Sequence, residues 1–179
     1  MGLLCRAGCA LFLVALATTW VGSAYAQELE LRTIDFHSAA IDRTTKYNIL
    51  LPREYDDSTN RYPVLYLLHG LTQNYTAWGL SNGAPFYAGL YDDLIIVMPD
   101  AGNSWYTNYE KSGDGQVNNW ADHIVEDLIN HVDWNFRTIA RREGRAITGL
   151  SMGGYGALML GLRDPGLFIA IGTTSGALE

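Results

Sequence analysis

The sequence has few cysteines, few basic residues and no apolar run of membrane-spanning length, and each shortage excludes a class of protein. Acidic residues outnumber basic ones 19 to 12, giving a net charge of −7, which disfavours nucleic acid as a partner. A hydrophobic content of 48% with only 17% charged residues excludes a disordered chain. The glycines follow no triplet period and no heptad is sustained, so collagen-like and coiled-coil structures are excluded as well. What remains is typical of one globular domain.

The first 26 residues have the three parts of a secretory signal peptide. Arg6 supplies a short positive region, Ala10–Ala17 is an unbroken apolar run, and Ala24–Ala26 is a small-x-small exit. The apolar run is too short for a membrane-spanning helix, which needs about 20 residues. The sequence therefore predicts cleavage between Ala26 and Gln27 and export to a secreted or periplasmic location. The alternative interpretation is a buried helix of the domain.

Cleavage at this position leaves a domain of residues 27–179. Both cysteines, Cys5 and Cys9, belong to the segment that would be removed. The exported chain is then expected to have no disulfide and no cysteine nucleophile, so that its apolar core alone must stabilise it. No membrane partner is expected after cleavage, and the sequence gives no indication of an oligomeric state.

Four segments in the first half of the domain have the pattern of strands. Leu29–Phe36 and Thr45–Leu51 alternate apolar and polar residues, which predicts half-exposed strands at one edge of a sheet. Pro63–Leu68 and Leu94–Met98 are continuous apolar runs, typical of strands covered on both faces. Such strands indicate a central parallel sheet.

The second half of the domain alternates helices and strands. Apolar residues at helical spacing predict a surface helix over His123–Phe136, with Asn119 as a possible cap. Arg145–Gly149 and Phe168–Thr174 are expected as strands, and Met152–Leu162 as the helix between them. This order predicts an α/β fold with a mostly parallel central sheet and helices on both faces. The long irregular segment from residue 101 to residue 120 is expected to be functional because compact domains rarely carry such loops.

Gly149-Leu-Ser151-Met-Gly153 carries the chemistry that the sequence suggests. It lies where a predicted strand becomes a predicted helix, which is the context of a nucleophile elbow. Glycine at both flanking positions removes side chains that would collide at this sharp turn. The turn would expose the Ser151 hydroxyl at the edge of the sheet and point the N–H of Met152 at a substrate oxyanion.

A second oxyanion donor is expected from the loop after an earlier central strand. The segment His69–Thr72 follows the predicted strand Pro63–Leu68, and the N–H of Leu71 is the candidate donor. The alternative is a glycine-containing strand exit with no special role.

Four stretches of the chain resemble the putative-esterase branch of the α/β-hydrolases, which contains esterase D (S-formylglutathione hydrolase), tributyrin esterases, feruloyl esterases and mycobacterial mycolyltransferases. The resemblance covers nearly all of the chain from about Leu29 onward and is strongest to tributyrin-esterase-like members. The stretches that carry it are Tyr62–Leu71, Ile95–Asp100, Asn103–Thr107 and Gly149–Gly156. The resemblance implies Ser151 as nucleophile, Met152 and Leu71 as oxyanion donors, and Trp105 and Tyr106 near the acyl pocket.

The resemblance implies a serine carboxylic-ester hydrolase that forms an acyl-enzyme on short-chain acyl or aryl esters or thioesters. In that family the catalytic acid and histidine follow the nucleophile after two further strands, whereas no histidine follows Ser151 in this sequence. We therefore expect an N-terminal portion of the fold whose last strands are missing. The alternatives are an inactive remnant or binding module of the same fold, or an acyltransferase.

The four histidines offer no evident base and no metal site. His69 is interpreted as a hydrogen-bonding partner of its own oxyanion loop, and His37 belongs to the first predicted strand. His123 and His131 are assigned structural roles on the surface helix. No zinc-ligand spacing is present, so neither a metal nor a cofactor is expected.

Several aromatic residues are candidates for the walls of an acyl or aryl pocket, although ordinary packing would explain them equally well. They are Trp78, Trp105, Tyr106 and Tyr109.

Overall fold

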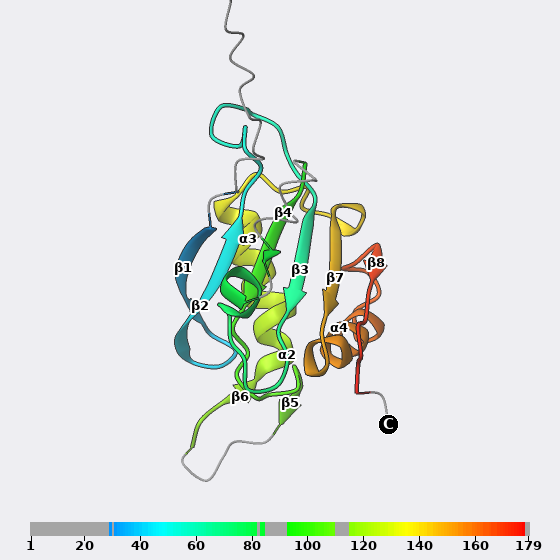
Figure 1. Ribbon diagram of the computed structural model, residues 1–179. Coiled ribbons are helices and arrows are strands. Elements are labelled where there is room, and N and C mark those ends of the chain that lie inside the picture. Colours follow the sequence, from blue (N-terminus) through cyan, green and yellow to red (C-terminus); the bar gives the residue numbers. More distant parts are fainter. Residues whose placement is uncertain (1–28, 30, 82, 85–92, 110–114, 178–179) are drawn as a thin grey trace, which may run out of the picture.

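Six strands form one sheet in the order β1-β2-β4-β3-β7-β8 (Figure 1). The computed structural model describes residues 29, 31–81, 83–84, 93–109 and 115–177, so the predicted signal peptide lies outside the described residues. The strands of this sheet are β1 (Leu31–Ser38), β2 (Arg43–Leu50), β3 (Val64–Leu68), β4 (Ile95–Pro99), β7 (Arg145–Gly149) and β8 (Ala170–Ile171).

The pairing of the strands confirms the predicted division between an edge and a parallel centre. β1 and β2 form an antiparallel hairpin in which Leu31 lies opposite Leu50, and β2 pairs antiparallel with β4. From β4 through β3 and β7 to β8 every pairing is parallel. The carboxyl ends of β3 and β7 therefore meet at one edge of the sheet, where Leu68 pairs with Gly149.

Helical segments connect the strands. One continuous helix consists of α2 (Trp120–Asp122), the π-helical η2 (His123–Leu128) and α3 (Ile129–Asn135). A second helix, α4 (Met152–Arg163), follows β7 directly. The short elements are η1 (Ala77–Ser81), η3 (Arg142–Gly144), and the paired strands β5 (Asn108–Tyr109) and β6 (Asn118–Asn119). Among the described residues, none of the helices combines the length and apolar character that a bilayer crossing requires.

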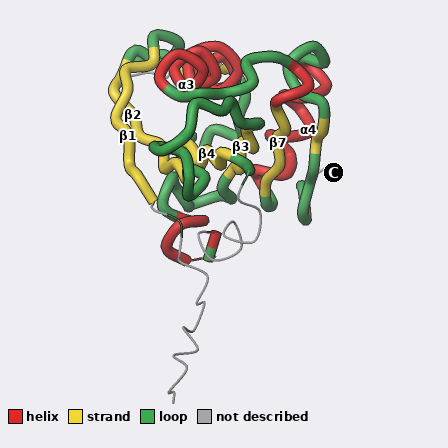
Figure 2. Tube along the Cα trace, turned by 90° about the horizontal axis from the view of Figure 1, so that it is seen from above, coloured by secondary structure: helices red, strands yellow, loops and turns green. Residues whose placement is uncertain are grey.

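Side chains of the central strands point alternately to the two faces of the sheet, and both faces are apolar. On one face Tyr66 and Val97 pack with Ile124 of η2 and Ala157 of α4, and Figure 2 shows α3 lying along this side of the strands. On the other face the buried side chains pack against Trp78 of η1; they include Leu50, Ile96 and Met98. The prediction of a sheet covered on both faces is thus confirmed.

Two local predictions are wrong in detail. The expected strand Phe168–Thr174 is reduced to β8, whose two residues are exposed; Thr174 adds a single bridge to Leu150. Asn119 occupies the N-cap position of α2, but its side chain makes no cap hydrogen bond. The carboxamide oxygen of Asn108 accepts hydrogen bonds from the N–H groups of Ala121 and Asp122 instead, so the start of the helix is capped from strand β5.

Candidate active site

Ser151 lies at a sharp turn between β7 and α4, as the sequence predicts. Its φ of 55° and ψ of −118° are a strained combination for a residue with a side chain. A Cβ atom added at Gly149 would lie 2.5 Å from the carbonyl carbon of Gly153, and one added at Gly153 would lie 2.4 Å from the carbonyl oxygen of Leu68. Both glycines are therefore needed for the close approach of α4 to the ends of β7 and β3.

The backbone of Ser151 is fixed while its hydroxyl remains free. The N–H of Ser151 donates to the carbonyl of Thr174 at 2.9 Å, and its own carbonyl accepts from the N–H of Tyr155 at 3.0 Å. Among the described residues, the hydroxyl group has no hydrogen-bond partner. The half-buried side chain is thus held by its backbone alone. The sequence did not single out Thr174, because a backbone contact leaves no signal in residue type.

The two expected oxyanion donors lie beside this turn. Met152 is the first residue of α4, so its N–H has no partner within the helix. Leu71 follows β3, and a Cβ atom added at the adjacent Gly70 would be 3.7 Å from the Cβ of Ser151. Within the part of the chain that the structure describes, neither N–H group donates a hydrogen bond. The geometry leaves both amides free for an incoming oxyanion.

His69 is buried below this loop, and both of its ring nitrogens are hydrogen-bonded. Its Nε2 accepts a hydrogen bond from the N–H of Ala101 at 3.0 Å, which places the proton on Nδ1. Nδ1 then donates to the carbonyl of Gly70 at 2.8 Å. Burial lowers the pKa of His69, so the ring is neutral and its Nε2 does not act as a cation toward Asp100, 3.8 Å away. The interpretation that His69 supports its own loop is confirmed.

Trp105 and Tyr106 occupy very different environments. Both have positive φ values, 56° and 57°. The Trp105 side chain is 38% exposed and meets the ring of Tyr155 edge to face at 5.6 Å between centroids. Tyr106 is fully buried, and its hydroxyl donates to the carbonyl of His69 at 2.9 Å. The ring of Tyr106 packs beneath the oxyanion loop, against Gly156, so it presents no exposed surface, and its expected place near the acyl pocket stays a prediction.

His123 departs from its assignment to a surface position. The ring is fully buried and stacks on Phe36 at 5.5 Å between centroids. Its Nε2 lies 3.2 Å from the carbonyl oxygen of Asp100, whereas its Nδ1 has no hydrogen-bond partner among the described residues. Burial is the main cause that lowers its pKa to about 4. The predicted helix is present, but His123 lies on the face of this helix that packs on the sheet.

Among the described residues, the remaining candidates make no hydrogen bond to Ser151. His131 packs against Phe36, and exposed His37 lies on β1, so these histidines have structural surroundings. Trp78 donates from its indole N–H to the carbonyl of Leu68 at 3.1 Å and packs on the sheet, whereas Tyr109 is exposed on β5. Among the described residues, no group of three His, Cys, Asp or Glu side chains is arranged to hold a metal ion.

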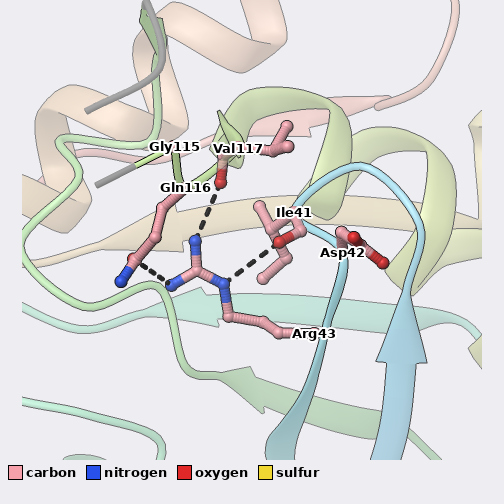
Figure 3. A pocket seen from close by; sticks show the side chains of 6 residues that line it. All are labelled: Ile41, Asp42, Arg43, Gly115, Gln116 and Val117. Carbon is pink, nitrogen blue, oxygen red and sulfur yellow. Dashed lines mark hydrogen bonds between the residues drawn. The ribbon is translucent and has the colours of Figure 1, made fainter. Parts of the chain in front are cut away.

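A separate hollow lies between the β1–β2 turn and the segment before β6 (Figure 3). Arg43 dominates it, and the guanidinium donates to the carbonyls of Ile41 and Val117 and to the side chain of Gln116. These donors are committed to the protein itself, so among the described lining residues no cationic group is left unpaired for an anionic ligand. The lining residues are Ile41, Asp42, Arg43, Gly115, Gln116 and Val117.

A mostly parallel sheet with a serine at the strand–helix turn, beside two amides that donate no hydrogen bond among the described residues, is the arrangement of an α/β-hydrolase fold. The comparisons with known proteins agree with this class. The family model described as "Putative esterase" matches residues 38–179, so the chain belongs to that esterase family.

Individual relatives and solved structures show the same likeness. An esterase of Mycobacterium tuberculosis (strain H37Rv) is 38% identical over 144 residues, which are 79% of this chain and 31% of that protein. A solved ferulic acid esterase superposes with a TM-score of 0.72 at 27% identity, over 83% of this chain and 59% of that one. The fluorophosphonate-binding serine hydrolase F of Staphylococcus aureus gives 0.70 at 25% identity, over 80% and 56%. The chain thus spans less than a third of the mycobacterial esterase and somewhat more than half of the two solved structures.

Proposed function

We propose that this protein is a serine ester hydrolase that works through an acyl-enzyme on Ser151. The observation that carries the proposal is the free Ser151 hydroxyl at a strained turn beside two unbonded amides, those of Leu71 and Met152. Strain at a serine between a strand and a helix is expected where a nucleophile must stand clear of the backbone. Membership of the esterase family supports the same reaction class.

The proposed reaction begins with attack of the Ser151 oxygen on the ester carbonyl carbon. The carbonyl oxygen becomes an oxyanion that accepts hydrogen bonds from Leu71 and Met152, with the positive end of α4 adding to the field. The serine proton passes to a general base and from there to the leaving alcohol, and water then releases the acyl group. His69 is not this base, because both of its nitrogens are engaged. The resemblance implies a base downstream of Ser151, where this sequence contains no histidine.

The substrate proposal is a short-chain acyl or aryl ester or thioester. The exposed ring of Trp105, which meets Tyr155 one turn beyond Ser151, supplies an aromatic surface next to the nucleophile. An aromatic ring in such a position favours flat or small apolar acyl groups. The similarity to a solved ferulic acid esterase supports this choice.

Export by cleavage of residues 1–26 is part of the proposal. It rests on the short apolar run and the small-residue exit in the sequence. Expression of the full chain in a bacterium, followed by mass spectrometry of the secreted or periplasmic fraction, should give a protein that begins at Gln27. Material that still begins at Met1 would contradict this part.

Covalent labelling tests the reaction itself. A fluorophosphonate probe should modify the folded protein, and peptide mapping should place the adduct on Ser151. The variant Ser151→Ala should not be labelled, whereas Ser38→Ala, which changes a buried serine bonded to Asp127, should retain labelling if it folds. A folded wild-type chain that gives no Ser151 adduct would favour an inactive remnant or a binding module of the same fold.

A further inference from the structure

The loop that carries Leu71 is fastened on both sides of that residue. The N–H of Gly70 donates to the side-chain oxygen of Gln73 at 2.8 Å. The N–H of Thr72 donates to the side-chain oxygen of Asn103 at 2.8 Å. Of three consecutive amides, the first and third are thus satisfied by carboxamide oxygens, and the middle one is left unbonded.

The carbonyl groups of His69 and Gly70 are hydrogen-bonded as well. The Gly70 carbonyl accepts from His69 Nδ1, and the His69 carbonyl accepts from the Tyr106 hydroxyl. These contacts fix the peptide planes on the N-terminal side of Leu71. Since the orientation of an N–H follows that of its peptide plane, the plane that carries the Leu71 amide has its carbonyl oxygen fixed by His69.

Thr72 needs an external partner to keep its conformation. Its φ is 64°, in the left-handed region that a β-branched residue rarely adopts. Asn103 supplies this partner from the loop after β4, which is itself held where the Gly102 N–H donates to the side chain of Asp100 at 2.9 Å. A contact between two loops that come from neighbouring strands therefore maintains a strained residue directly after the oxyanion donor.

We infer that Gln73 and Asn103 are positioning residues for the oxyanion hole, an inference that rests on the proposed function of Ser151. Their carboxamide oxygens accept hydrogen bonds from the two flanking amides, so that of these three consecutive amides only that of Leu71 is left for the substrate oxyanion. Asn103 also holds Thr72 in its left-handed conformation. Neither side chain needs to touch the substrate, because each acts through the backbone of the loop.

The sequence indicated one of these residues only indirectly. Asn103 begins one of the stretches that carry the family resemblance, yet an exposed asparagine in a long loop has no motif that assigns it to an amide across the site. Gln73 lies two residues after Leu71, where a side-chain oxygen can return to the backbone of its own turn.

Amide hydrogen exchange measured by NMR tests the arrangement without any need for turnover. In the wild-type chain the amides of Gly70 and Thr72 should exchange at least about 10-fold more slowly than that of Leu71. Asn103→Ala should remove the protection of Thr72, and Asn103→Asp, which keeps an acceptor oxygen, should restore it. Equal exchange of Leu71 and Thr72 in the wild type would overturn the inference.

The rate of fluorophosphonate modification and the Leu71 amide signal test the consequence for the site. Asn103→Ala and Gln73→Ala should each slow formation of the Ser151 adduct by about 10- to 100-fold, because a displaced donor stabilises the oxyanion less well. The Leu71 amide resonance should shift on adduct formation in the wild type and shift less in the variants. Asn74→Ala is the matched control. Among the described residues, the side chain of this exposed neighbour accepts hydrogen bonds from Thr76 alone, and its backbone carbonyl accepts from Ala77, so the wild-type rate is expected.

The two failures are distinguishable. Absence of any adduct on the wild-type chain would contradict the proposed function. The exchange pattern of Gly70, Leu71 and Thr72 would still decide whether the hydrogen bonds from Gly70 to Gln73 and from Thr72 to Asn103 exist. Wild-type adduct formation with unchanged rates in both alanine variants would overturn the positioning roles alone.

Discussion

The carboxyl end of β3 and β7 and the interface between the β1–β2 hairpin and the long helix are built on different principles. At the first, strained backbone is held by polar contacts; Thr72, Trp105, Tyr106 and Ser151 all have positive φ. At the second, apolar and aromatic side chains such as Phe36, Tyr47 and Ile124 pack on regular strands and helix. Four residues of positive φ thus gather around the group presented to a substrate, although Asp42 in the β1–β2 turn also has a φ of 48°. Ordinary packing supplies the stability that maintains this strain.

Gly153→Ala would break the first region and should have the largest effect. The new methyl group would lie 2.4 Å from the Leu68 carbonyl oxygen and 2.7 Å from that of His69, both backbone atoms that cannot move aside easily. We expect a loss of unfolding free energy of about 3 kcal/mol or more, together with loss of labelling at Ser151. Chemical denaturation measures the first effect.

The control for this variant is Gly166→Ala. An added Cβ at Gly166 meets nothing within 4 Å, so stability should change by no more than about 0.5 kcal/mol. A Gly153→Ala protein as stable as the wild type would show that α4 can move away from β3, contrary to the close packing of Gly153 on the end of β3.

Ile124→Ala removes packing from the second region. The side chain is fully buried between the helix and the sheet, so its truncation should lower the unfolding free energy by about 3 kcal/mol. The surviving folded fraction should still be labelled at Ser151, because no contact of the elbow is changed. If labelling falls much further than the folded population, measured by circular dichroism, the two regions are not separable in this way.

The buried histidines connect the two regions and predict a pH dependence. Burial lowers the pKa of His69 and lowers that of His123 to about 4, so the folded protein binds these protons less readily than the unfolded chain. Stability should therefore be complete above the unfolded pKa of about 6.5 and fall as the pH drops toward 4, by about 2 kcal/mol or more. Denaturation at a series of pH values measures the slope.

His123→Gln isolates the larger of these contributions. A glutamine cannot take up the proton, so the slope between pH 6.5 and pH 4 should be shallower than in the wild type. Superimposable stability profiles of the two proteins would show that His123 is not the group that opposes protonation.

Ser151→Gly should give the smallest effect, and in the opposite direction. The serine side chain makes no cap hydrogen bond to α4, so glycine loses no contact and relieves the strained φ of 55°. We expect a gain of about 1 kcal/mol in unfolding free energy with complete loss of labelling. Asp42→Gly, at a φ of 48° in the β1–β2 turn, is the matched control and should retain labelling. Destabilisation by Ser151→Gly would contradict strain at the elbow.

Local pattern predicted much of this structure. Apolar runs located β3 and β4, and the spacing of the glycines around Ser151 located the turn because their packing against β3 and α4 depends on residue size. The positions of Tyr106 and His123 could not be predicted in this way. Both are buried by elements distant in sequence, and an aromatic or imidazole ring suits a pocket wall and a core equally well.

The side-chain hydrogen bonds to the oxyanion loop could not be predicted from local sequence either. Asn103 meets the Thr72 amide only because β3 and β4 are neighbours in the sheet, 31 positions apart in the chain. Asn108 similarly caps α2 from strand β5, whereas the sequence next to the helix predicts Asn119 as the cap. Side chains that act on distant backbone carry no periodic signal.

The bond between the Ser151 amide and the Thr174 carbonyl ties the elbow to the segment that follows β8, and Thr174 also bridges Leu150. Displacement of this segment from the end of β7 would release the Ser151 amide and loosen the turn. The conformation of the nucleophile therefore depends on backbone from the next strand of the sheet, and not only on the residues of the turn.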